Sequence, residues 1–178
     1  MKKVLLIFVI VLVTESIHAQ FSFGLKAGVN FSKFNTKEQV LKTDGNAWQV
    51  GFVSRFKIPL IGLGLQPELL YSVNKGESNS IGYFQIPINL HWQPLPIPLI
   101  KPVILAGPYF GYAVNFKGFD TFKDNFERFD WGIGLGLAVE IWKIQIGGRY
   151  NWGLQNISGV RDFSLKSNVF TLSAAYFF

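Results

Sequence analysis

The residues of this sequence that could do chemistry are few, and most are isolated charges in apolar surroundings. Lys26, Glu68 and Arg149 each interrupt a stretch of alternating apolar and small residues. A carboxylate enclosed in such a setting needs a partner, because removing an unpaired charge from water costs several kcal/mol. We therefore expect Glu68 to pair with Lys26 or Arg149 and to plug a narrow interior. The alternative is that these groups line a polar permeation path or a proton relay.

Other catalytic or metal-binding groups are poorly represented. His91 is the only histidine beyond residue 19, and the chain contains no cysteine. These ligands are too few for a transition-metal site, so we expect no metal and no cofactor. No serine and acid are identifiably placed beside His91, which predicts a hydrogen-bonded histidine at a strand end and a protein that is not an enzyme.

A glycine series resembles a nucleotide-binding loop only superficially. Gly132, Gly134 and Gly136 alternate on one face of a single predicted strand. No helix follows them to receive a phosphate group at its N-terminus. They indicate small residues that face a crowded interior.

The composition narrows the class of protein. Hydrophobic residues make up 49% of the 178 residues and charged residues only 16%, against a usual charged share of about 25%. This excludes a disordered chain, which needs high charge and low hydrophobicity. Without residues 1–19 the chain keeps 15 basic and 10 acidic side chains. That modest excess predicts no nucleic-acid partner.

The first 19 residues have the pattern of a secretory signal peptide. Lys2 and Lys3 precede an unbroken apolar run from Val4 to Val13, which is shorter than the roughly 20 residues of a spanning helix. A more polar stretch then ends at Ala19, which predicts cleavage before Gln20. We expect residues 1–19 to be removed and residues 20–178 to form one domain.

The rest of the chain alternates large apolar residues with small or polar ones at the period of β-strands. Residues 129–141, for example, place Phe129, Ile133 and Leu135 on one face, and Asp130 and Gly134 on the other. One segment, 103–115, is apolar on both faces, so its orientation stays open. The eight predicted strands are 21–32, 48–58, 63–72, 84–92, 103–115, 129–141, 144–154 and 170–178.

These strands are long enough to cross a bilayer. Their length is about 9–13 residues, whereas strands of soluble proteins average about 5–6 and tilted transmembrane strands need about 9–11. The polar face is mostly Gly, Ser, Asn and Gln, which suits a narrow interior better than a water-facing surface. The fold predicted is all-β: an eight-stranded antiparallel up-and-down transmembrane β-barrel in the bacterial outer membrane, preceded by a cleaved signal peptide.

The connections and the tryptophans agree with this fold. Long charged connections near 35–46, 74–82, 116–128 and 155–167 alternate with short turns near 60–61 and 142–143, as in outer-membrane barrels with periplasmic termini. All five tryptophans lie near predicted strand ends, which predicts a membrane-interface belt. Its members are Trp48, Trp131 and Trp152 at the outer ends, and Trp92 and Trp142 at the inner ends.

The C-terminal strand ends in Phe178, with Tyr176 on the same face. Such an aromatic ending resembles the signal that barrel-insertion machinery recognises. We expect that machinery to be a partner during biogenesis.

Several motifs together resemble the PorT-like small outer-membrane β-barrel proteins of Gram-negative bacteria. They include GLKAGVNFS at 24–32, YFQIPINL at 83–90, AGPYFGY at 106–112, FDWGIGLGLAVE at 129–140, GGRYNWGLQNI at 147–157 and NVFTLSAAYFF at 168–178. The resemblance covers nearly all of the chain after residue 19 and implies a barrel rather than an activity, although a few members resemble secretion components. The inner connection 93–102 departs from the tight turn expected there. It is interpreted as a rigid linker, with a docking segment as the alternative.

The expected function is a structural or partner-binding role in a barrel with a filled lumen, linked to secretion or envelope integrity. Its partners would be outer-membrane lipids, lipopolysaccharide and an unknown protein. One alternative is a narrow, porin-like channel for ions or small solutes. Another is a secreted, soluble, ligand-binding barrel.

Overall fold

A computed structural model describes residues 21–35, 40–41, 47–58, 62–75, 80–95, 97, 99–117, 128–154 and 166–178. The predicted signal peptide, residues 1–19, lies outside them. The strands are β1 (Phe21–Asn35), β2 (Val40–Leu41), β3 (Trp48–Ile58), β4 (Leu63–Lys75), β5 (Ser80–Trp92), β6 (Lys101–Lys117), β7 (Phe129–Ile141), β8 (Ile144–Gly153) and β9 (Lys166–Phe177). Within these ranges no helix has the length and apolar character needed to cross a membrane.

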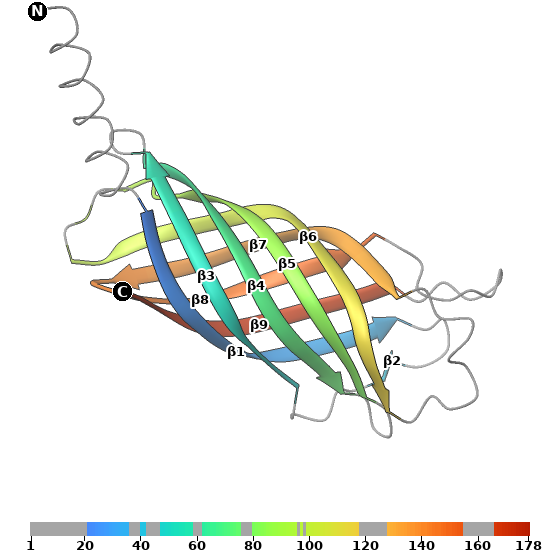
Figure 1. Cartoon of the computed structure of the whole chain (residues 1–178). Coiled ribbons are helices and arrows are strands. Elements are labelled where there is room, and N and C mark those ends of the chain that lie inside the picture. Colours follow the sequence, from blue (N-terminus) through green and yellow to red (C-terminus); the bar gives the residue numbers. More distant parts are fainter. Residues whose placement is uncertain are drawn as a thin grey trace, which may run out of the picture.

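The sheet closes on itself, as Figure 1 shows. Strands β1 and β3 to β9 pair antiparallel in chain order, and β9 pairs with β1 from Gly24–Phe177 to Asn35–Lys166. The two-residue β2 only extends the end of β1, where it pairs with Phe34 and Asn35. The predicted closed barrel of eight strands is therefore confirmed. The first residues of β1 and the C-terminus lie at the same end of it.

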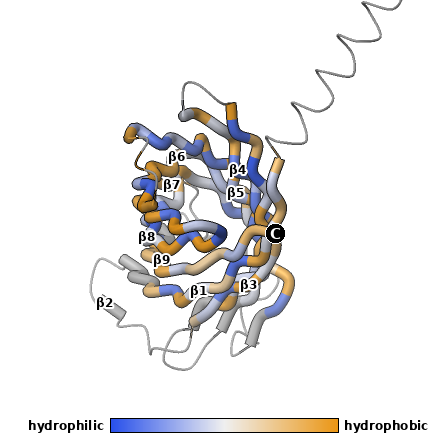
Figure 2. Tube along the Cα trace, turned by 90° about the vertical axis from the view of Figure 1, so that its left-hand side faces the viewer, coloured by the Kyte–Doolittle hydropathy of each residue, from blue (hydrophilic) through white to orange (hydrophobic). Residues whose placement is uncertain are grey.

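The bulky apolar face of each strand points outward. Phe23, Ile133 and Leu172 are 42–50% exposed, whereas Gly134 is buried and Asn151 is only 9% exposed. Figure 2 shows the corresponding alternation of hydrophobic and hydrophilic residues along the strands. This arrangement is the reverse of a soluble protein, whose large apolar side chains pack inside.

The structure settles the facing of the segment that the sequence left open. In β6, Val103, Leu105 and Tyr109 are buried in the lumen, while Phe110 and Tyr112 are exposed outside. This strand is apolar on both faces because the part of the lumen that it lines accepts apolar side chains as well as polar ones.

The strand lengths differ in part from the prediction. Strands β1 and β6 have 15 and 17 residues, longer than the predicted upper value. The C-terminal ends of β1 and β6 extend past the predicted alternating segments, to Asn35 and Lys117. There, β1 is paired with β2 and β9, and β6 with β5.

The two ends of the barrel differ in their connections. At one end, the turn end, residues 59–62, 93–100 and 142–143 join the strands. Here Gly62 has φ +64°, and Trp142 has φ +56°, a left-handed conformation that a bulky residue rarely adopts. At the other end, the loop end, the connections are 36–47, 76–79, 118–128 and 154–165, apart from β2.

Candidate functional site

An ion pair lies in the middle of the lumen. Lys26 on β1 donates to both carboxylate oxygens of Glu68 on β4, at 2.8 and 3.0 Å. The two side chains are 5% and 1% exposed. The structure therefore places Lys26 on Glu68, with Arg149 elsewhere in the lumen.

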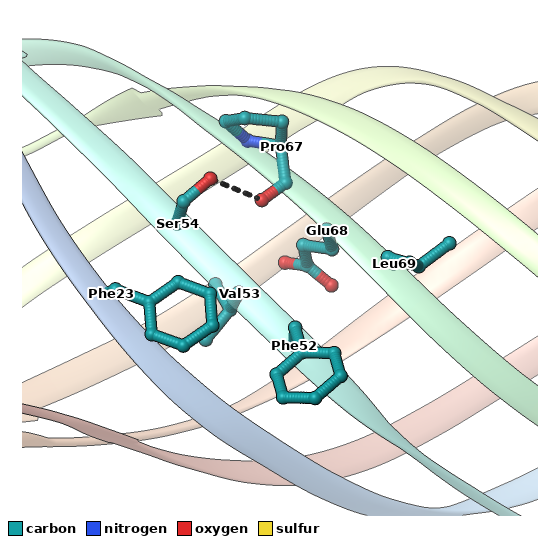
Figure 3. Close-up of a pocket in the computed structure, with 7 residues that line it drawn as sticks. All are labelled: Phe23, Phe52, Val53, Ser54, Pro67, Glu68 and Leu69. Carbon is teal, nitrogen blue, oxygen red and sulfur yellow. Dashed lines mark hydrogen bonds between the residues drawn. The ribbon is translucent and has the colours of Figure 1, made fainter.

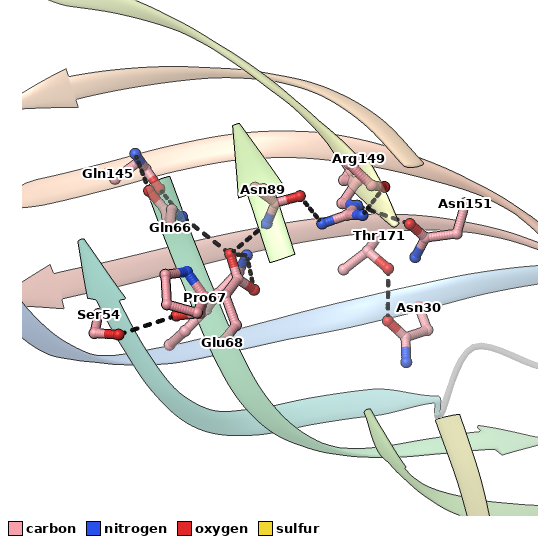
Figure 4. Close-up of polar contacts among 12 residues, drawn as sticks. Asn30, Ser54, Gln66, Pro67, Glu68, Asn89, Gln145, Arg149, Asn151 and Thr171 are labelled. Carbon is pink, nitrogen blue, oxygen red and sulfur yellow. Dashed lines mark hydrogen bonds and ion pairs between the residues drawn. The ribbon is translucent and has the colours of Figure 1, made fainter. Parts of the chain in front are cut away.

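Amides extend this pair into a network that crosses the barrel (Figure 4). Glu68 Oε1 also accepts hydrogen bonds from Gln66 Nε2 at 2.9 Å and Asn89 Nδ2 at 3.1 Å. Gln66 in turn donates to Gln145 on β8 at 3.1 Å, and β8 lies opposite β4 in the closed sheet. The Glu68 carboxylate is thus held by one cation and two amides.

Arg149 is linked to Glu68 only through Asn89. Its guanidinium donates to Asn89 Oδ1, to Asn151 Oδ1 at 2.7 Å and to the Gly107 carbonyl at 3.2 Å. Among the described residues it makes no ion pair. A Cβ atom added at Gly134 would meet both the Arg149 guanidinium and the Asn151 amide, which explains glycine on this face.

Sequence reasoning named the charges of this network but not its amides. Gln66, Asn89 and Gln145 are buried and occupy the inward face of their strands. These amides alternate with large apolar residues along their strands, and that alternation could have identified them as lumen residues. Which amide meets which charge depends on strands that are distant in the sequence.

A second group of charges lies at the turn end of the lumen. Glu140 on β7 accepts hydrogen bonds from Arg55 Nη1, from Lys57 Nζ at 3.1 and 3.3 Å, and from Gln93 Nε2 at 3.2 Å. The Arg55 guanidinium also stacks on the Phe177 ring, 3.9 Å from its centroid. Because β3 and β7 are on opposite sides of the barrel, these contacts close its mouth.

His91 differs from the expectation of a hydrogen-bonded histidine. It lies at the end of β5 as predicted, but its side chain is fully buried, and neither ring nitrogen has a hydrogen-bond partner among the described residues. Its Nε2 approaches Glu140 Oε2 only to 4.0 Å. Within the described part of the chain the prediction of a hydrogen-bonded histidine is therefore wrong. The Glu140 oxygen nearest to Nε2 already accepts from Arg55, Lys57 and Gln93.

Little space remains where Lys26, Gln145 and Arg149 meet. A cavity bordered by Lys26, Gln145 and Arg149 measures about 10 Å³, roughly the volume that one water molecule needs. Within the described strands and turns, no group of three or more His, Cys, Asp or Glu side chains could hold a metal ion. The arrangement can close the lumen and hold its walls together.

The aromatic residues singled out in the sequence lie on the outer surface. The five tryptophans are between 39% and 79% exposed, and Tyr176 and Phe178 are also exposed. The Phe178 amide donates to the Phe23 carbonyl at 2.8 Å, so the last residue is joined to β1. The interface belt and the insertion signal stay predictions.

The barrel wall has a pocket on its outer face between β1, β3 and β4 (Figure 3). It has a volume of about 350 Å³ and is lined by Phe23, Phe52, Val53, Ser54, Pro67, Glu68 and Leu69. Here the β3–β4 pairing is interrupted between Val53–Glu68 and Phe56–Leu65. Pro67 has no N–H to donate to a ladder. The Ser54 hydroxyl donates instead to the Pro67 carbonyl at 3.3 Å.

We expect Ser54→Ala to lower the free energy of unfolding by about 1 kcal/mol, because it leaves that carbonyl without its donor in an apolar wall. Chemical denaturation of the barrel in lipid vesicles measures this. Ser173→Ala is the control for the loss of a serine hydroxyl from a strand, since Ser173, which borders the lumen cavity, makes no side-chain hydrogen bond among the described residues. An equal loss in both variants would contradict a role for the Ser54 bond.

Comparison with known proteins agrees with this geometry. The sequence profile of a family described as outer membrane protein beta-barrel domain matches residues 15–159. The chain belongs to this family. It is therefore an integral β-barrel protein of the bacterial outer membrane. Short turns face the periplasm in such barrels, which places the turn end on that side. No curated protein matches the sequence.

Several solved structures have a similar fold, and Ail and NspA are two of them. Ail, the attachment invasion locus protein of Yersinia pestis, is 15% identical with a TM-score of 0.54, over 89% of this chain and 99% of Ail. Neisserial surface protein A, NspA, is 18% identical with a TM-score of 0.55, over 88% of this chain and 97% of NspA. At these identities the likeness of this outer-membrane barrel to both concerns the fold alone.

Proposed function

We propose that this outer-membrane barrel is non-conducting and that it has a structural or partner-binding role. The observation that carries the proposal is the Lys26–Glu68 ion pair, which is buried in mid-lumen and extended by amides to the opposite wall. The Arg55–Glu140 pair closes the periplasmic mouth in the same way. A lumen filled in this manner leaves the outer surface and the loops to carry function.

The partner would meet the barrel at its loop end or its lipid-facing wall. Lipopolysaccharide and an unknown protein are the partners that we propose, with the insertion machinery acting only during biogenesis. The resemblance to PorT-like proteins supports a finer assignment to secretion or envelope integrity. We propose no enzymatic activity, since the lumen charges of Lys26, Glu68, Arg55 and Glu140 are engaged with one another.

Conductance across a planar lipid bilayer tests the closed lumen. The wild-type barrel should be silent, because ion pairs and amides occupy the lumen at two levels. The variant Gln66→Gly with Glu68→Gly and Asn89→Gly removes three side chains of the middle level. Combined with Arg55→Gly and Glu140→Gly, which remove the ion pair at the mouth, it should pass current. Heat-modifiable mobility on a gel checks that both proteins are folded. Discrete conductance steps from the wild type would overturn the proposal.

A narrow channel is the second candidate. Polar side chains form a continuous chain from Gln145 through Gln66, Glu68 and Asn89 to Arg149, and such a chain favours a path for small ions. The same bilayer experiment decides between the two functions. A soluble ligand-binding barrel is no longer a candidate, because the chain is an outer-membrane protein.

A further inference from the structure

The periplasmic mouth of the barrel carries a surplus of positive charge. Arg55, Lys57, Lys101 and Lys143 lie there against two described carboxylates, the Glu140 side chain and the C-terminal carboxylate of Phe178. The connection 93–100 adds no charge. At the loop end the sequence instead has nearly balanced charges, with three basic and three acidic side chains in 116–128. Positive charge is therefore concentrated on one side of the membrane.

The side-chain carboxylate at this mouth is already saturated. Glu140 is bound by Arg55, Lys57 and Gln93, and Arg55 Nε has no partner among the described residues. Lys57 is also repelled by Arg55 and Lys101. The Lys57 side chain is 27% exposed, so it lies between the buried Arg55–Glu140 pair and the solvent-exposed rim of the mouth. The surplus charge at that rim is complementary to an external anion.

An apolar lip flanks the same mouth at the β5–β6 and β7–β8 connections. Its members come from the end of β5, the proline-rich connection and the turn after β7, and all are exposed: Trp92, Leu95, Ile97, Leu99, Ile100 and Trp142. Through Trp92 the lip continues the lipid-facing wall, since Leu90 on the same face of β5 is also exposed. Trp142 keeps a left-handed backbone, a strained conformation that often marks a functional position.

We propose that the basic mouth and the apolar lip together bind an anionic glycerophospholipid of the periplasmic leaflet. The headgroup phosphate would contact the lysine ammonium groups of Lys57, Lys101 and Lys143. The acyl chains would lie along the lip. A soluble anion would use the lysines but would leave the lip exposed to water, which is why the occupant is a lipid. The proline-rich connection is then a docking segment for the membrane surface.

Native mass spectrometry of the folded barrel, released from micelles that contain equal amounts of phosphatidylglycerol and phosphatidylcholine, tests this proposal. We expect phosphatidylglycerol to be retained preferentially. Changing Lys57, Lys101 and Lys143 to Gln should weaken that preference by about fivefold for each lysine, because one lysine near an anionic surface contributes about 1 kcal/mol. Phosphatidylcholine binding should not change.

The matched control changes Lys75, Lys117 and Lys166 to Gln, which removes three lysines at strand ends on the loop side. Leu99→Ser with Ile100→Ser should weaken retention of both lipids. Equal retention of the two lipids by the wild type, or an equal effect of the control, would overturn the proposal. So would complete displacement of phosphatidylglycerol by inorganic phosphate, which would identify a soluble anion as the ligand.

Discussion

Glu68→Ala should lower the free energy of unfolding by about 3–5 kcal/mol, the usual consequence of breaking a buried ion pair by removing one partner. Lys26 would keep a charge that is almost completely enclosed. Gln66 and Asn89 would lose the acceptor that they share. Urea-induced unfolding in lipid vesicles, followed by tryptophan fluorescence, measures the change.

A double variant separates the ion pair from simple packing. Replacing both Lys26 and Glu68 with Met should recover the part of the lost stability that comes from the unpaired Lys26 charge, because a buried pair can often be exchanged for apolar residues of similar volume. Glu77→Ala changes a carboxylate of the sequence between β4 and β5 that is not part of the lumen network; as the control, it should change stability by less than about 0.5 kcal/mol. If Glu68→Ala proved as mild as Glu77→Ala, the plug would have to be abandoned.

Leu135→Arg should destabilise the inserted barrel by about 2–4 kcal/mol, the cost of an arginine on the lipid face at the bilayer midplane. Leu135 is the central residue of β7 and points outward, 49% exposed. In an aqueous barrel the same exposed position would accept arginine at little cost. The experiment is again reversible unfolding in vesicles, with the amount of inserted protein measured in parallel.

Phe129→Arg provides the depth control on the same strand and the same face. Phe129 is the first residue of β7 and is also exposed, so its substitution should cost only about 0–1 kcal/mol near the interface. A cost that is equal at the two positions would contradict the placement of β7 across the bilayer. The comparison needs no assumption about the lumen, since both side chains face outward.

The barrel fold, and which side chains point outward or into the lumen, could be predicted from the sequence because both depend on local patterns. Alternation with period two decides which side chains share a face, as Ile133 and Gly134 show. Strand length and the contrast between long connections and short turns then indicate a membrane barrel. The orientation of segment 103–115 could not be predicted in this way. Its lumen-facing residues include Val103 and Tyr109, so the two faces of the segment do not differ in polarity.

The contacts inside the lumen were decided only by the tertiary structure. The sequence placed Lys26, Glu68 and Arg149 on inward faces, yet the choice of Lys26 over Arg149 depends on how the strands are staggered around the closed barrel. His91 could not be assigned an environment for the same reason, since its neighbour Glu140 is on β7 and two of the three competing donors, Arg55 and Lys57, are on β3. Periodicity along one strand carries no information about which residues meet across the lumen, because those meetings depend on the shear of all eight strands together.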